Sequence, residues 1–168
     1  MDSSISKIII GIMGSANPTK KILEHAYTLG QLLAKEGFVV LTGGTNRGVM
    51  DEALKGAKSV GGRTVGILKE DHLLNMSPYI DIPIVTGLGS ARNNINVLTS
   101  SIIVACGIGK GTASEIALAL KANKNVIMLG ADELSNNFFK NLCSEKVWIV
   151  SEPLQVIKCI ENLLFSKG

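Results

Sequence analysis

Short, wholly apolar runs that alternate with helical patterns constrain the fold of this 168-residue chain more than any other feature. Most of these runs are apolar at consecutive positions, which is typical of strands buried on both faces of a parallel sheet. We predict seven strands, at residues 7–12, 38–41, 63–68, 82–85, 101–106, 125–129 and 146–150. The order β-α-β-α-β, then β-α-β-α-β-α-β-α, predicts an α/β fold: a Rossmann-like, doubly wound, mainly parallel sheet with helices on both faces. The length suits a single domain, residues 1–168.

The helices between the strands have recognisable ends and apolar faces. Asn17-Pro18 predicts an N-cap followed by proline at the first helical position, and Gly37 predicts the residue just beyond that helix. Predicted core positions recur at helical spacing. They are Ile22, Ala26, Leu29 and Leu33; Met50, Ala53, Leu54 and Ala57; Ala91, Ile95 and Leu98; and Leu154, Ile157, Ile160 and Leu164. The least regular stretch, residues 69–81, is predicted to be a surface loop that could act as a lid.

Composition narrows the classes of function. A hydrophobic content of 46% and a charged content of 18% argue against disorder, and a net charge of +3 with dispersed lysines gives no case for nucleic-acid binding. No apolar run approaches the roughly 20 residues of a membrane-spanning helix, and the first residues do not resemble a signal peptide. Three widely spaced cysteines and two histidines match neither a disulfide framework nor a metal site. We therefore expect a cytoplasmic protein without membrane association or bound metal.

Four glycine-bearing turns follow predicted strands, at residues 11–15, 43–48, 87–90 and 107–111. In doubly wound sheets, ligands bind outside the carboxyl ends of the strands, so we expect these turns to converge on one site. The fourth turn belongs to the sequence Gly-Ile-Gly-Lys-Gly-Thr-Ala-Ser-Glu, residues 107–115, between a strand and a helix. Unpaired backbone N–H groups and the helix dipole favour an anion there. The sequence predicts a phosphate-binding loop, although a tight turn alone would also use glycine. The residues expected to bind the phosphate are Gly107, Gly109, Lys110, Gly111 and Thr112.

Glu115 and Arg92 are the candidate reactive side chains. Thr112-Ala-Ser-Glu115 matches a capping box, in which Glu115 reaches back to the N-cap, but Glu115 could also meet a ligand hydroxyl. Arg92 lies in the first turn of a predicted helix, where the dipole disfavours a cation by about 0.3–1 kcal/mol. An anionic ligand or the Glu115 carboxylate would explain this placement, and a solvated surface arginine is the alternative.

The first two turns supply further candidate binding residues. They are Gly14, Ser15, Gly43, Gly44 and Arg47. Arg47 could contact a phosphate or a sugar, or cap the following helix, and Ser15 could donate to a ligand or simply end its turn. Lys110 could equally be solvated, whereas Met50 and Cys106 are predicted to be core residues.

Three motifs together resemble the SLOG superfamily, the lysine-decarboxylase-like proteins related to LONELY GUY. Residues 43–57 resemble its GG(x)nGVM segment, residues 107–115 its GGxGTxxE loop, and residues 86–93 the segment that supplies its arginine. The short length, the turns at residues 81–84 and 87–89 and the helix at residues 114–121 resemble the branch that contains the molybdenum-cofactor carrier proteins.

The resemblance implies two alternative functions. The first is binding of a phosphorylated nucleotide-like small molecule, such as the molybdenum cofactor or a nucleotide, with no other cofactor required. The second is a phosphoribohydrolase that cleaves nucleoside 5′-monophosphates to free base and ribose 5-phosphate, with Glu115 at the oxocarbenium-like centre and Arg92 assisting. Gly107-Ile108-Gly109 stands where the enzymes have Pro-Gly-Gly, and Asn93 where lysine often follows the arginine. The resemblance also implies a homo-oligomer, a dimer or a tetramer.

Overall fold

One parallel sheet forms the centre of the computed structural model, which describes residues 8–165. Its seven strands run in the order β4-β3-β2-β1-β5-β6-β7. They are β1 (Ile9–Gly14), β2 (Val39–Thr42), β3 (Thr64–Leu68), β4 (Ile82–Val85), β5 (Ile102–Cys106), β6 (Val126–Leu129) and β7 (Val147–Val150). The predicted strands and the doubly wound α/β fold are confirmed. Lys7, the first residue of the first predicted strand, lies outside the described residues.

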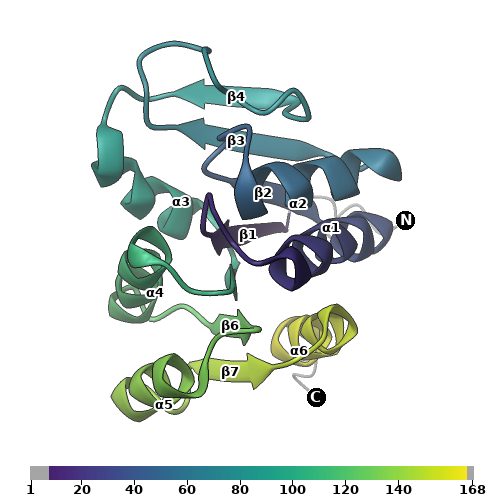
Figure 1. Ribbon diagram of the computed structural model, residues 1–168. Helices are drawn as coiled ribbons and strands as arrows, with labels where there is room; N and C mark the ends of the chain where they lie inside the picture. Colours follow the sequence, from purple (N-terminus) through teal and green to yellow (C-terminus); the bar gives the residue numbers. More distant parts are fainter. Residues whose placement is uncertain (1–7, 166–168) are drawn as a thin grey trace.

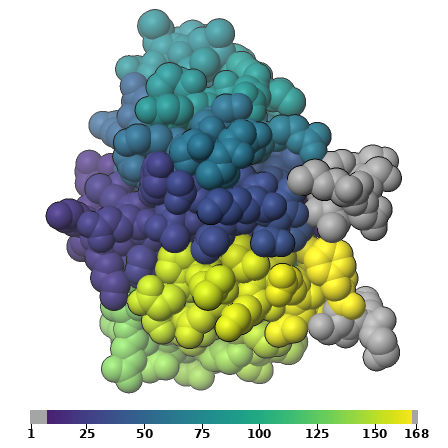
Figure 2. All heavy atoms as spheres, turned by 90° about the vertical axis from the view of Figure 1, so that its right-hand side faces the viewer, coloured from purple at the N-terminus to yellow at the C-terminus, as the bar shows by residue number. Residues whose placement is uncertain are grey.

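Helices cover both faces of the sheet. They are α1 (Lys20–Lys35), α2 (Gly48–Ser59), α3 (Asn93–Thr99), α4 (Lys110–Lys121), α5 (Glu133–Leu142) and α6 (Pro153–Phe165), with a 3-10 turn, η2 (Gly89–Arg92), before α3. In Figure 1, α1, α2 and α6 lie on one side of the sheet and α3, α4 and α5 on the other. Figure 2 shows the side of the molecule covered by α1, α2 and α6, on which α1 lies between the other two helices.

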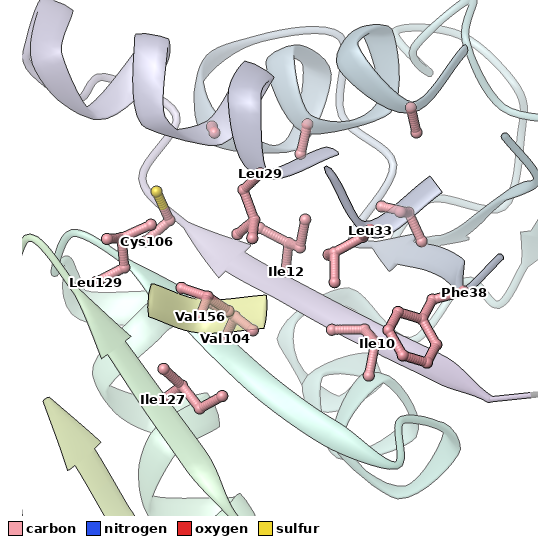
Figure 3. Close-up of a cluster of buried hydrophobic side chains, with 14 of the residues drawn as sticks. Ile10, Ile12, Leu29, Leu33, Phe38, Val104, Cys106, Ile127, Leu129 and Val156 are labelled. Carbon is pink, nitrogen blue, oxygen red and sulfur yellow. The ribbon is translucent and has the colours of Figure 1, made fainter. Parts of the chain in front are cut away.

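Each face of the sheet has its own apolar core, which explains the consecutive apolar residues in the strands. On one face, Ile10 and Ile12 of β1 pack against Leu29 and Leu33 of α1 (Figure 3). Ile9 and Met13 of the same strand belong to the second core, beneath α3, α4 and α5. Alternate residues thus enter different cores, and each face contributes burial free energy of about 25 cal/mol per Å² of apolar surface.

The start of α1 differs from its prediction. Thr19, rather than Asn17, is the N-cap, and its Oγ1 accepts a hydrogen bond from Ile22 N at 3.4 Å. Asn17 and Pro18 therefore belong to the loop that follows β1. The predicted end is confirmed, because Gly37 directly follows the C-cap and has a φ of 83°.

The apolar face predicted for residues 91–98 is confirmed only at Ile95, which packs against the core beneath α4. Leu98 is 56% exposed, whereas Arg92 and Asn96 are buried. The segment begins as a 3-10 turn, whose three residues per turn shift the side-chain positions that an α-helical pattern assumes. Part of the buried side of this segment is polar, because Arg92 lines the cavity described below and Asn96 contacts Glu115. In α6, Leu154 is likewise exposed, and the other predicted core positions are buried or partly buried.

Candidate functional site

The four glycine turns converge on one cavity at the carboxyl edge of the sheet. The cavity has a volume of about 260 Å³ and is lined by Gly14, Gly43, Gly89 and Gly109, one from each turn. It opens beside β1 and β5, the adjacent strands from which the chain winds outward in opposite directions. This is the switch point at which doubly wound folds bind ligands. The predicted convergence is therefore confirmed.

The end of β2 makes room for Arg92. This side chain is 7% exposed, and its Nη2 donates a hydrogen bond to Gly43 O at 3.3 Å. A Cβ atom at Gly43 would overlap Arg92 Nη2, so that glycine at this position admits the guanidinium into the cavity wall. Arg92 is thus a buried wall residue rather than a solvated surface arginine.

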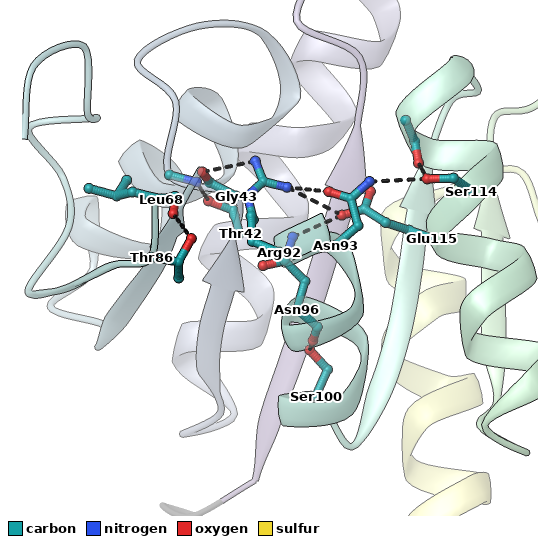
Figure 4. Close-up of polar contacts among 12 residues, drawn as sticks. Thr42, Gly43, Leu68, Thr86, Arg92, Asn93, Asn96, Ser100, Ser114 and Glu115 are labelled. Carbon is teal, nitrogen blue, oxygen red and sulfur yellow. Dashed lines mark hydrogen bonds and ion pairs between the residues drawn. The ribbon is translucent and has the colours of Figure 1, made fainter. Parts of the chain in front are cut away.

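Arg92 and Glu115 form the charged centre of the cavity. Arg92 Nη1 lies 3.8 Å from Glu115 Oε1, which also accepts a hydrogen bond from Asn96 Nδ2 at 2.8 Å (Figure 4). Burial raises the pKa of Glu115, although Asn96 and Arg92 partly offset this effect. Burial also lowers the pKa of Arg92, with Glu115 opposing the shift. The guanidinium stays protonated at neutral pH, because arginine is not deprotonated in proteins.

Asn93 links Arg92 to the start of α4. Arg92 Nη1 donates to Asn93 Oδ1, and Asn93 Nδ2 donates to Ser114 Oγ at 3.0 Å. Ser114 Oγ in turn donates to Gly111 O at 2.7 Å. The asparagine that departs from the superfamily pattern therefore connects the arginine to the glycine loop.

The support from Asn93 and Asn96 was missed by the sequence-based predictions. Arg92, Asn96 and Ser100 recur at a spacing of four residues, and all three are buried. Ser100 Oγ donates to Asn96 O at 2.8 Å, which continues the series down α3. The polar stripe at helical spacing is the feature of the sequence that indicates this buried polar side.

The capping box predicted for residues 112–115 is wrong. Helix α4 begins at Lys110 with Gly109 as its N-cap, three residues before the predicted N-cap, Thr112. Thr112 is therefore inside the first turn, and Glu115 faces Asn96 and Arg92 instead of the helix start. Gly109 has the extended backbone that is usual at an N-cap, so the first free N–H groups of the helix follow it directly.

Two buried donors in the cavity wall lack a partner. Thr112 is 2% exposed, and its Oγ1 has no hydrogen-bond partner among residues 8–165. Arg92 Nε is unsatisfied in the same part of the structure. A buried polar group without a partner costs about 1–3 kcal/mol, so these atoms fit a ligand that brings acceptor oxygens. Together with the free N–H groups of α4, they make the wall suitable for an anion.

Most of the predicted binding residues line this cavity. They are Gly14, Ser15, Gly43, Arg92, Gly109, Lys110, Gly111, Thr112 and Glu115. Their roles in binding remain predictions. The sequence missed Lys69 and Ser90, which also line the cavity. Met50, predicted to be core, is only partly buried and lines the cavity too.

Three predicted binding residues lie elsewhere. Gly44 has a φ of 74° and faces the side chains of Leu68 and Ile80, so its role is to allow the turn. Arg47 is exposed at the N-cap position of α2 and makes no capping hydrogen bond through its side chain. Gly107, with a φ of 68°, lines a neighbouring cavity.

Two further findings describe the chain between residues 8 and 165. No three His, Cys, Asp or Glu side chains there gather in a group that could hold a metal ion. None of the helices in this part combines the length and the apolar character needed to cross a membrane.

Cys106, at the end of β5, is fully buried, and burial raises the pKa of its thiol to about 12. It is a core residue, as predicted.

Comparison with known proteins assigns the chain to a family. The sequence model of the SLOG cluster4 family matches residues 7–157. The chain belongs to this family. An uncharacterised protein of Archaeoglobus fulgidus is 43% identical to this SLOG cluster4 protein over 121 residues, which cover 71% of this chain and 78% of the relative.

Two solved structures are close to it over nearly their whole length. The molybdenum cofactor binding protein of Rippkaea orientalis is 53% identical, with a TM-score of 0.92 over 94% of this chain and 98% of the other. The molybdenum cofactor carrier protein of Chlamydomonas reinhardtii is 46% identical, with a TM-score of 0.89 over 94% of this chain and 99% of the other.

Proposed function

We propose that this SLOG cluster4 protein binds the molybdenum cofactor in the cavity at the carboxyl edge of its sheet and acts as a carrier for it. The observation that carries the proposal is the 53% identity to a molybdenum cofactor binding protein across 94% of the chain. The similarity extends over nearly the whole chain and is not limited to one motif.

The residues of the cavity fit the chemistry of this ligand, a pterin that bears a phosphate group. The first N–H groups of α4 and the orphaned Thr112 hydroxyl offer donors to the phosphate oxygens. Lys110 and Lys69 line the same cavity and add positive charge. Glu115 supplies the complementary function, because a buried carboxylate accepts hydrogen bonds from ring N–H groups or hydroxyls.

Thermal denaturation with the purified cofactor tests the proposal. A ligand at about 100 times its dissociation constant adds roughly 2.7 kcal/mol to the free energy of unfolding, which raises the melting temperature. Arg92→Ala should weaken binding by about tenfold or more, since it removes charge-assisted hydrogen bonds. Asn137→Ala, an exposed substitution on α5, is the control and should bind as the wild type does. Absence of any shift in the wild-type protein would overturn the proposal.

A second candidate function, nucleoside-monophosphate phosphoribohydrolase, is supported by the Arg92–Glu115 pair. A carboxylate in a cavity with a phosphate-binding loop can stabilise the positive charge that develops on a sugar carbon as its glycosidic bond breaks. Release of ribose 5-phosphate from AMP, abolished in Glu115→Ala, would establish this activity. A wild-type rate equal to that of the protein-free blank at saturating AMP would exclude AMP hydrolysis.

A further inference from the structure

A second cavity adjoins the first across the loop that follows β1. It has a volume of about 300 Å³ and is formed by the entry to α1, the end of β5 and the turn after β6. Asn17, Thr19, Ile108 and Asp132 are among its lining residues. Ser15 lines both cavities, so the two share a wall at the switch point of the sheet.

Ser15, in the wall between the two cavities, carries a hydrogen-bond donor. Ser15 Oγ accepts a hydrogen bond from Asn17 N at 3.0 Å, which leaves the hydroxyl hydrogen available to a ligand. Gly109 lies beside Ser15, because a Cβ atom there would be in van der Waals contact, 3.5 Å from Ser15 Cβ. Since Gly109 is the N-cap of α4, the start of this helix adjoins the wall that both cavities share. A phosphate at the α4 N-terminus would therefore lie beside both cavities.

The chemistry of the second cavity differs from that of the first. Asp132 caps α5, and its carboxylate accepts from Ser135 N at 2.9 Å and from Ser135 Oγ at 2.7 Å. These hydrogen bonds lower the pKa of Asp132, so it is charged at neutral pH and retains lone pairs for further donors. The side chains of Ile22 and Ile108 add apolar surface. This combination disfavours a second phosphate and suits sugar hydroxyls or ring N–H groups beside an apolar ring face.

We propose that the second cavity binds the nucleotide half of a ligand whose phosphates lie over Ser15 and Gly109, so that the protein accepts the cofactor extended through its phosphate by a nucleotide. The inference rests on the proposed function, which fills the first cavity. Each cavity is close to the lower end of the range for small-ligand pockets, about 300–1,000 Å³, and the two together suit a ligand of dinucleotide size. Binding across the switch point is also how related sheets hold dinucleotides.

The test compares two ligands, the cofactor and its nucleotide-extended form, by titration calorimetry. The extended form should bind the wild type at least about tenfold more tightly, as expected for one or two added hydrogen bonds to a charged group. Asn17→Trp places an indole in the second cavity and should abolish that gain, with the affinity for the unextended cofactor changed less than about twofold. Asp132→Asn should reduce the same gain while it leaves an oxygen to cap α5. Asn137→Trp, on the exposed side of α5, is the matched control and should leave both affinities unchanged.

The two proposals fail in different ways. Equal affinities for the two ligands in the wild type, unchanged in Asn17→Trp and Asp132→Asn, would overturn the assignment of the second cavity and leave the proposed function standing. Failure of the wild type to bind either ligand would overturn the proposed function and this inference together.

Discussion

At the scale of single residues, the cavity contains two opposite charges that the protein satisfies incompletely. Arg92 and Glu115 are each more than nine-tenths buried, and burial shifts the pKa of each toward its neutral form. Their 3.8 Å separation is long for a charge-assisted hydrogen bond, and Arg92 Nε has no partner among residues 8–165. A ligand that supplies oxygens to Arg92 and donors to Glu115 would complete both sets of contacts.

The raised pKa of Glu115 predicts how stability depends on pH. The folded chain holds the Glu115 proton more tightly than the unfolded chain, whose carboxyl has the ordinary pKa of 4.5. As pH rises from that value through the raised folded pKa, Glu115 therefore lowers the free energy of unfolding. Glu115→Gln lacks this loss and retains an oxygen for Asn96, so its stability relative to the wild type should increase with pH.

Urea denaturation of both proteins at several pH values measures this difference. Glu24→Gln, on the exposed surface of α1, is the control and should show no such trend relative to the wild type. If the free energy of unfolding of Glu115→Gln instead falls relative to that of the wild type as pH rises, Arg92 stabilises the carboxylate more than burial destabilises it.

Gly43 is predicted to act on binding through Arg92. In Gly43→Ala, the new methyl group would overlap Arg92 Nη2 and displace the guanidinium, so cofactor affinity should fall by about tenfold or more. A double-mutant cycle with Arg92→Ala isolates this coupling, because the methyl group no longer meets a guanidinium in that background. Gly43→Ala should then add little to the effect of Arg92→Ala. Fully additive effects in calorimetric titrations would contradict the coupling.

At the scale of elements, the N-cap of α4 is a glycine, so the nearby Thr112 side chain is available for a role other than capping. Because Gly109 is the N-cap, Thr112 Oγ1 does not cap the helix, and it is buried without a partner in the part of the chain that the structure describes. Thr112→Val removes an unsatisfied hydroxyl, so the free energy of unfolding should stay unchanged or rise by about 1 kcal/mol. Cofactor affinity should fall in the same variant, since a phosphate would lose a donor.

The matched comparison is Asp132→Ala, which removes a side chain that does cap its helix. It should lower the free energy of unfolding by about 1 kcal/mol, as N-cap replacements commonly do. Chemical denaturation of both variants distinguishes the roles. A loss in Thr112→Val as large as the loss in Asp132→Ala would show that Thr112 stabilises the helix start after all.

The sequence predicts the elements of this protein better than it predicts their ends. Strands buried on both faces are visible as consecutive apolar residues, and α1 and α6 as apolar faces. The start of α1 differs from its prediction because Asn17, Pro18 and Thr19 are all acceptable near a helix start. Contacts with the rest of the fold determine which residue is the N-cap. The buried side of α3 was missed because its partners, Arg92 and Glu115, are distant in the sequence and become neighbours only when α3 and α4 meet.

At the scale of the whole molecule, the order of the strands explains why four distant turns form one site. The chain winds outward from β1 to β2, β3 and β4 on one side and from β5 to β6 and β7 on the other, so the turns before α2 and α3 face the turn after β5 across one opening. The sequence predicts this edge, because glycines mark the turns that must pass close to a ligand. It does not predict the Asn93 and Asn96 contacts, which depend on the distance between two packed helices.

A ligand in this position should therefore protect backbone amides in both halves of the sheet. Hydrogen exchange followed by mass spectrometry, with and without the cofactor, would report on the two halves separately. We expect slower exchange at residues 109–113, at the start of α4, and at residues 43–48, between β2 and α2, because residues 109–112 and Gly43 line the cavity. Peptides from the second half of α6 serve as the control, since this part of the helix does not line the cavity and should exchange at an unchanged rate. Protection confined to residues 109–113 would mean that the ligand contacts only the phosphate loop, and that Arg92 and Gly43 do not help to hold it.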